Sequence, residues 1–278
     1  MTGGHPLSLA HVTALQLPPA QLARLAAGLG LSHIGLRLMP ATPEELDHAL
    51  LGNGSALRET LAAIADSGVR VLDVEVARLR PESNVAGFEP LLEAAARLRA
   101  SHVVVTGHDP DPARLAASFA ALCALAQPYG VTANLEFMRF TQVPDLAAAL
   151  DILSRADQPN SGVLVDSLHF DRSRADFSLL RALPRRWLHY AQLCDAPADW
   201  EDDDAALIYT ARQARLAPGT GGIDLSGYLA ALPSGLPLSL EVPCAQARGD
   251  PAAWAAHVVA AARQLLNRPR PISGKEVL

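Results

Sequence analysis

The sequence contains 278 residues, of which 50% are hydrophobic, 19% charged and only 5% aromatic. This composition supplies a large apolar core built mainly from Ala, Leu and Val, and it excludes an intrinsically disordered chain. The net charge of −6 argues against a nucleic-acid-binding protein, because such proteins usually present a basic surface.

Three cysteines, Cys123, Cys194 and Cys244, show neither a disulfide framework nor the spacing of a zinc knuckle. We expect Cys194 and Cys244 to pack as small apolar side chains. The first ten residues lack the basic segment and apolar core of a signal peptide, and no apolar run approaches the roughly 18 residues that span a bilayer. The sequence therefore predicts a cytoplasmic protein without a membrane or nucleic-acid partner.

Eight short apolar runs alternate along the chain with eight segments that are rich in Ala and Leu, a pattern typical of alternating strands and helices. The expected strands are residues 7–13, 33–38, 69–76, 102–106, 131–137, 162–166, 187–193 and 238–242. The expected helices are residues 18–29, 55–67, 88–100, 111–129, 144–155, 176–183, 224–232 and 250–267. The strand–helix units repeat about every 30–35 residues, as in a (β/α)₈ barrel.

No linker or change in composition divides this series. The sequence therefore predicts an α/β fold class with a single (β/α)₈ TIM barrel over residues 1–267, followed by a tail at residues 268–278. A doubly wound open sheet is the alternative, but it usually has fewer strands and a glycine fingerprint after the first strand, which this chain lacks.

The last four expected strands each bring an oxygen-bearing side chain near their C-terminal end: Glu136, Asp166, Gln192 and Glu241. In a barrel these ends meet at one mouth, where active sites lie. Three carboxylates brought together repel one another, so protons or a cation must neutralise them. Oxygen ligands favour Mn²⁺ or Mg²⁺ over Zn²⁺. Alternatively, each acid pairs with an arginine or caps the next helix.

This arrangement resembles the xylose isomerase-like TIM-barrel superfamily. Its hallmarks are a Glu that ends strand five, D-x-x-H at strand six, H-x-x-D on strand seven, and a Glu that ends strand eight. The corresponding residues here are Glu136, Asp166–His169 (DSLH), Gln192–Asp195 (QLCD) and Glu241. The resemblance covers essentially the whole chain. It implies one divalent metal ion, Mn²⁺ or Mg²⁺ favoured and Zn²⁺ or Co²⁺ possible, bound by Glu136, Asp166, Gln192 and Glu241.

One position departs from the pattern, because Gln192 replaces the histidine that ligates metal in many members. A glutamine there is similar to what some 3-dehydroshikimate dehydratases carry, which favours a lyase. Asp195 is expected to support the site indirectly or to open the following loop. His189 lies three residues before Gln192, and strand alternation predicts that it packs or faces a helix.

Glu136, Glu241 and His169 are the expected catalytic residues. The two glutamates approach from different strands and could serve opposite faces of a carbon atom. His169 is expected in the turn beyond strand six, where an imidazole could act as general base near neutral pH. The expected substrate-binding residues are Arg215, Glu75, His108, Arg37 and Arg248.

Among these, Arg215 is the preferred partner of a phosphate or carboxylate, with Arg212 and Arg248 as rivals. Arg37 could instead pair with Glu75. Residues 196–222 are long for a connection at this face and are a candidate lid. The acidic run 201–204 inside them is expected to be a solvated stretch.

The expected function is a divalent-metal-dependent isomerase or epimerase of a sugar or sugar phosphate, working through a metal-stabilised enediolate. The alternative is a lyase of the 3-dehydroshikimate or inosose dehydratase type. The substrate would be a small keto-sugar, polyol or hydroxy-keto acid. A histidine-rich zinc nuclease and a non-catalytic binding barrel are the remaining alternatives. Members often form dimers or tetramers, but no interface can be read from the sequence.

Overall fold

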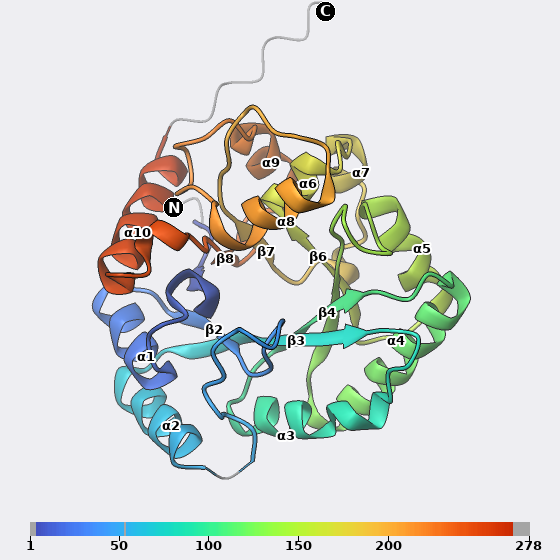
Figure 1. Ribbon diagram of the computed structural model, residues 1–278, viewed down its shortest axis with the longest axis horizontal. Helices are drawn as coiled ribbons and strands as arrows, with labels where there is room; N and C mark the ends of the chain where they lie inside the picture. Colours follow the sequence, from blue (N-terminus) through green and yellow to red (C-terminus); the bar gives the residue numbers. More distant parts are fainter. Residues whose placement is uncertain (1–3, 53, 269–278) are drawn as a thin grey trace, which may run out of the picture.

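Eight parallel strands close into a barrel in the computed structural model, which describes residues 4–52 and 54–268. Each strand pairs with the next along the chain, and β8 closes the barrel by pairing with β1 (Figure 1). The strands are β1 Leu7–Leu9, β2 His33–Arg37, β3 Arg70–Leu79, β4 His102–Gly107, β5 Thr132–Glu136, β6 Ser161–Asp166, β7 Ala191–Leu193 and β8 Leu238–Leu240. The predicted (β/α)₈ barrel is confirmed. Its predicted end at residue 267 stays a prediction, and residues 269–278 of the predicted tail lie outside the described residues.

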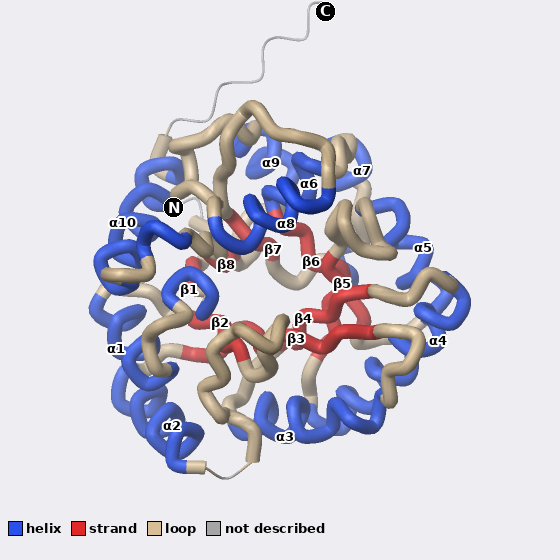
Figure 2. The backbone as a smooth tube through the Cα atoms, viewed as in Figure 1, coloured by secondary structure: helices blue, strands red, loops and turns tan. Residues whose placement is uncertain are grey.

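Helices surround the strands on all sides (Figure 2). The α-helices are α1 Pro19–Gly28, α2 Ser55–Ser67, α3 Glu89–Arg97, α4 Pro112–Ala126, α5 Leu146–Ala156, α6 Ser167–Arg172, α7 Phe177–Arg181, α8 Asp204–Gln213, α9 Leu225–Ala231 and α10 Pro251–Leu266. Short 3₁₀ helices are η1 His11–Ala14, η2 Val85–Phe88, η3 Gln127–Tyr129, η4 Arg185–Trp187 and η5 Ala245–Ala247. Among the described residues, no helix has both the length and the apolar character that crossing a membrane requires.

Aspartates begin many of these helices. Asp111, Asp145 and Asp203 each accept hydrogen bonds from backbone N–H groups of the first turn of α4, α5 and α8. Such caps satisfy donors that have no partner within the helix. Proline in the first turn of α4 and α10 fits the same positions, because the N–H that proline lacks would be unpaired there.

Alternation along the strands separates two layers of side chains. Leu238 and Leu240 of β8 join the large apolar cluster between strands and helices, whereas Ser239 is buried outside that cluster. A smaller cluster, formed by Leu72, Val76, Val104, Leu164 and Tyr190, fills part of the barrel interior. The interior of the barrel is therefore partly apolar and partly polar, and the candidate site lies in its layer at the C-terminal ends of the strands.

The first and seventh strand predictions were too long by four residues each. The first strand ends at Leu9 and continues as η1. There the Thr13 hydroxyl donates to Leu240 O at 2.8 Å and accepts from Val242 N at 2.8 Å, so a side chain replaces strand pairing. The seventh strand begins at Ala191, because the preceding residues form η4. Helices α6 and α8 were not predicted.

Candidate active site

A cavity of about 810 Å³ lies at the C-terminal ends of the strands. Every expected catalytic and substrate-binding residue lines it: Arg37, Glu75, His108, Glu136, His169, Arg215, Glu241 and Arg248. Two expected metal ligands do not line it, because Asp166 and Gln192 are buried, with 0% and 1% of their surface exposed. The sequence therefore located the mouth of the barrel, and the roles of these residues stay predictions.

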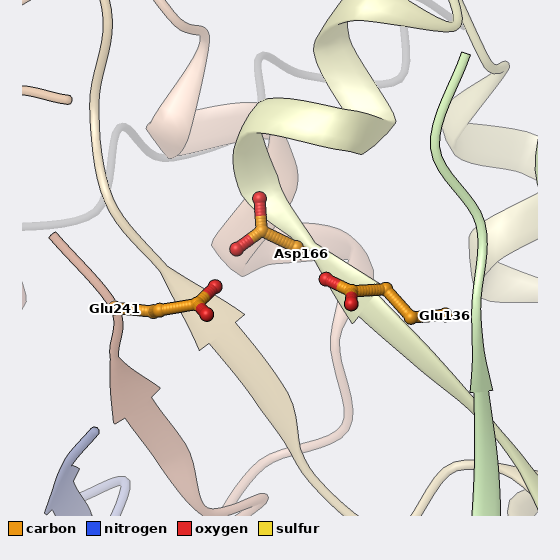
Figure 3. Close-up of side chains that lie close together, drawn as sticks. All are labelled: Glu136, Asp166 and Glu241. Carbon is orange, nitrogen blue, oxygen red and sulfur yellow. The ribbon is translucent and has the colours of Figure 1, made fainter. Parts of the chain in front are cut away.

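Three carboxylates converge at one wall of the cavity. Glu136 ends β5, Asp166 ends β6 and Glu241 follows β8, and their side chains point toward one another (Figure 3). One carboxylate oxygen from each lies within 4.8 Å of the others. Parallel strands in a closed barrel place these positions together, although more than a hundred residues separate Glu136 from Glu241 in the sequence.

Arg215 is part of this acidic cluster. Its Nη1 lies 2.7 Å from Asp166 Oδ2 and 3.1 Å from Glu241 Oε2, and only 3% of the residue is exposed. The alternative that an arginine pairs with the acids therefore holds for Asp166 and Glu241. The alternative that an acid caps the next helix also holds for Asp166, because its Oδ1 accepts from the N–H groups of Leu168 and His169 at the start of α6.

One arginine does not balance three carboxylates. With all four groups ionised, Glu136, Asp166, Glu241 and Arg215 carry a net charge of −2, which one divalent cation would neutralise. Burial raises the pKa of Glu136 well above its ordinary value, and the nearby carboxylates of Glu241 and Asp166 raise it further. Burial also raises the pKa of Glu241 to about 8, against the opposing charge of Arg215. Without a cation, the cluster therefore retains protons near neutral pH.

Asp166 behaves differently. Burial alone would raise its pKa, but the Arg215 guanidinium, His169 and the hydrogen bonds hold the pKa of this carboxyl below its ordinary value. Asp166 is thus the carboxylate that stays ionised as the pH falls.

Gln192 presents one terminal amide atom to the cluster, 3.2 Å from Glu136 Oε1 and 3.1 Å from Glu241 Oε2. As a nitrogen, this atom donates a hydrogen bond to both carboxylates. As an oxygen, it suits a cation shared with them, since the oxygen ligands of a small divalent ion lie about 3 Å apart. The donor set therefore fits a divalent metal ion, and the same amide satisfies the cluster when no metal is bound.

His169 lies in the first turn of α6 rather than in a turn beyond the strand, which corrects the prediction. Its Nε2 is 3.9 Å from Glu136 Oε1, and its ring meets the edge of Phe140 with centroids 5.8 Å apart. Burial lowers the pKa of His169 to about 4, although the charge of Asp166 opposes this shift. The imidazole is therefore neutral at pH 7, which is the state a general base requires.

Arg37 pairs with Glu75, as one of the predicted alternatives proposed. Its Nη2 lies 3.0 Å from Glu75 Oε2, and its Nε lies 3.0 Å from Glu45 Oε1 in the connection after β2. Below this group, Asp73 is fully buried and contacts the Tyr190 hydroxyl at 3.3 Å. Burial and the nearby carboxylates of Glu75 and Glu241 raise the pKa of Asp73 well above its ordinary value.

Asp195 fixes the segment that follows β7. Its buried carboxylate accepts from the N–H groups of Ala196 at 2.9 Å, Gly219 at 3.0 Å, Gly221 at 2.9 Å and Ile223 at 3.1 Å. A side chain at Gly221 would come within 2.3 Å of Ala196 O, so this approach requires glycine. Of the two expected roles, Asp195 therefore organises the following loop.

Helix α8 lies within the candidate lid and extends across the barrel mouth (Figure 1). The preceding residues are attached to neighbouring elements. Asp202 pairs with Arg139 through two bonds of 2.6 and 2.7 Å, and Trp200 lies under Arg172, 5.0 Å from the ring centroid. The acidic run is exposed, as expected of a solvated stretch, and Asp202 attaches it to Arg139, while movement as a lid stays a prediction.

Several side chains differ from their expected surroundings. His189 packs inside the barrel, where Nδ1 lies 2.8 Å from Asn134 Oδ1, so the helix-facing alternative is wrong. Cys194 is buried, but its sulfur contacts polar atoms, Arg215 Nη1 at 3.4 Å and Ser167 Oγ at 3.6 Å. Arg78 also lines the cavity and was missed by the sequence analysis. Its position shortly after the third expected strand could have indicated that it reaches the barrel mouth.

The comparison with protein families agrees with this geometry. The model that describes the xylose isomerase-like TIM barrel matches residues 23–265. The chain belongs to the xylose isomerase-like TIM-barrel family. The resemblance seen in the sequence is thereby confirmed.

Curated relatives of this xylose isomerase-like chain include two kinds of enzyme. A 3-dehydroshikimate dehydratase of Pseudomonas aeruginosa is 35% identical over 136 residues, which are 48% of this chain and 21% of that protein. An inosose isomerase of Bacillus velezensis is 29% identical over 113 residues, 40% of this chain and 38% of that protein. The chain thus spans well under half the length of either relative.

Among solved structures, the IolI protein with a bound zinc atom has a TM-score of 0.74 and 21% sequence identity. The match covers 94% of this chain and 97% of that one. Such a likeness shows the shared fold.

Proposed function

We propose that the protein is a divalent-metal-dependent enzyme that removes the proton next to the ketone of a small hydroxylated substrate. The convergence of Glu136, Asp166 and Glu241, two of which line the cavity, beside a neutral His169, carries the proposal. A divalent ion bound there would polarise the ketone and stabilise the negative charge that forms. The oxygen ligands favour Mn²⁺ or Mg²⁺, and the zinc in the IolI structure supports including Zn²⁺ among the metals tested.

The residues of the chain divide the remaining work. His169 takes the proton, because its imidazole is neutral and lines the cavity. Gln192 and Arg215 orient the carboxylates, the first through its amide and the second through its ion pairs. Arg37 and Glu75 line the cavity beyond the cluster and are available to contact substrate hydroxyl groups.

Two reactions share this first step. Epimerisation needs groups that exchange a proton on both faces of one carbon, whereas isomerisation needs a group that moves a proton between neighbouring carbons, and Glu136 and Glu241 would serve either role. Dehydration needs one base. His169 takes the α-proton, the freed electron pair forms a carbon–carbon double bond, and the β-hydroxyl leaves with a proton as water. The ion pair of 3.1 Å between Glu241 and Arg215 favours dehydration, because it withdraws Glu241 from a role as base.

The relatives support both reactions, since one is a dehydratase and the other an isomerase. The experiment that separates them supplies the purified protein with Mn²⁺ and with either 3-dehydroshikimate or a panel of ketoses. Dehydration gives a new conjugated chromophore, whereas epimerisation gives a new sugar on chromatography. The matched control is Glu136→Gln. Turnover that persists in this variant, or in protein stripped of metal by EDTA, contradicts the proposal.

A further inference from the structure

One part of the cavity lining is basic, in contrast to the acidic cluster. Arg78 lies near the end of β3, and its register partner on β4 is Thr106. His108 follows β4, donates its N–H to Leu79 O at 2.7 Å and places Nε2 3.0 Å from the Thr106 hydroxyl. Arg212 comes from the last turn of α8. All of these except Leu79 line the cavity, and the two arginines, Arg78 and Arg212, are called the cationic rim below.

Arg78 and Arg212 line the same cavity and act on each other electrostatically, although they come from distant segments. Burial lowers the pKa of Arg78, and the charges of Arg80 and Arg212 lower it further. Burial lowers the pKa of His108 to about 4, and Arg78, Arg80 and Arg212 act in the same direction. Helix α8 therefore brings Arg212 to the cavity that Arg78 and His108 line, within electrostatic reach of both.

The cationic rim lacks the carboxylate partners that other arginines of the cavity have. Arg37 and Arg215 each pair with two carboxylates. By contrast, no carboxylate within the described ranges 4–52 and 54–268 lies within 4.0 Å of Arg78 or Arg212, and Arg78 donates instead to the carbonyl of Ala41. The charge of Glu45 offsets part of the repulsion at Arg78. The remaining like charges repel one another, and a bound anion would relieve that repulsion.

We propose that the cationic rim binds the anionic group, a carboxylate or a phosphate, of a substrate whose hydroxy-ketone end lies at the acidic cluster. This inference rests on the proposed function for the position of the hydroxy-ketone. It transfers the anion-binding role expected for Arg215, whose Nη1 is occupied by Asp166 and Glu241, to Arg78 and Arg212. A guanidinium suits either anion, because its planar fork of donors matches two oxygens at once.

The charges of the cavity walls also indicate which class of substrate fits. A cavity of about 810 Å³ has the size of a small-molecule site and presents carboxylates at one wall and unpaired cations at another. A neutral sugar would leave those cations without a partner. A hydroxy-keto acid or a sugar phosphate would complement both walls.

The test measures binding by calorimetry to protein that EDTA has freed of metal, so that turnover plays no part. Two matched pairs of probes differ in charge: 3-dehydroshikimate with its methyl ester, and fructose 6-phosphate with fructose. We expect one charged probe to bind at least about tenfold more tightly than its neutral partner, the factor that one charge-assisted hydrogen bond supplies. A preference in the first pair identifies a carboxylate, and a preference in the second identifies a phosphate.

The variants Arg78→Gln and Arg212→Gln are each expected to lower the affinity for the preferred anion about tenfold. The affinity for the neutral probe should not change. Arg212 is exposed, so its replacement tests the inference even if Arg78→Gln impairs folding. Arg181→Gln, at an exposed position of α7, changes the net charge equally and is expected to bind as the wild type does. Equal binding of charged and neutral probes, or an equal loss in Arg181→Gln, overturns the inference. The metal-dependent chemistry would be untouched by that result, because it is judged by turnover with Mn²⁺.

Discussion

Metal binding is expected to release protons, and Glu241 is one source. In the metal-free protein at pH 7, Glu241 is mainly protonated, because burial raises its pKa to about 8. Burial and the nearby carboxylates also raise the pKa of Glu136 well above its ordinary value, whereas Asp166 is paired with Arg215. A divalent ion that binds both glutamates as carboxylates must displace the proton of Glu241 together with any proton that Glu136 holds.

That proton count fixes how affinity depends on pH. Below both pKa values, the dissociation constant is expected to fall by up to about a hundredfold for each unit of pH, and by about tenfold per unit once Glu241 has ionised on its own. Titrations with Mn²⁺ in two buffers with different heats of protonation give the count directly. In Glu136→Gln the count should fall to about one. Tight binding with no proton release would refute the reasoning.

The same pKa values predict a stability profile for the metal-free protein. A carboxyl whose pKa is higher in the folded state than in the unfolded state stabilises the fold at low pH, and this contribution is lost as the pH rises through the folded-state pKa. For Glu241 the loss runs from the ordinary value of 4.5 to about 8, at no more than about 1.4 kcal/mol per pH unit. Mn²⁺ at a hundred times its dissociation constant should restore about 2.7 kcal/mol, measurable by thermal unfolding.

Three substitutions extend these expectations. Glu136→Gln should lower kcat by at least about a thousandfold. It should nevertheless raise the melting temperature of the metal-free protein at pH 8, because it removes a carboxyl whose pKa burial raises and whose ionisation at high pH therefore opposes folding; a lower melting temperature would contradict the account of the cluster. His169→Asn should lower kcat by about 10²–10⁴-fold while Mn²⁺ affinity, followed by calorimetry, stays near that of the wild type. Asp195→Ala should destabilise the protein by about 3 kcal/mol in urea unfolding, since four backbone N–H groups lose a buried acceptor; a change below about 0.5 kcal/mol would show that the loop holds without it.

The positions of Glu136, Asp166 and Glu241 could be predicted because each polar residue follows an apolar run that only a buried parallel strand explains. Once eight such strands are recognised, right-handed connections determine their order, and the barrel brings their ends together. The residue types then indicated the chemistry. This part of the site is encoded locally, within a few residues of each strand end.

The contacts of Arg215 could not be predicted in the same way. Its partners Asp166 and Glu241 lie 49 and 26 residues away, and the choice among Arg212, Arg215 and Arg248 depends on how α8 is oriented. The sequence of 196–222 lacks the strong apolar periodicity of the other helices, so α8 was overlooked. Asp203 was a readable sign of its start, because aspartate commonly caps a helix. Arg78 was missed for a related reason, since a bulge between Val74 and Ala77 shifts the register of β3.

The segment that carries α8 leaves and re-enters the barrel at nearly the same place. Asp195 and Leu216 form an antiparallel bridge at its base, and Ala214 bridges to Cys244 beyond β8. Insertions and replacements between these clamped points need not disturb the strands below. We therefore expect ligand preference in such barrels to diversify by exchange of residues 197–213, with Arg215 and the acidic cluster kept beneath them, and grafting this stretch between two relatives should transfer selectivity without refolding the host.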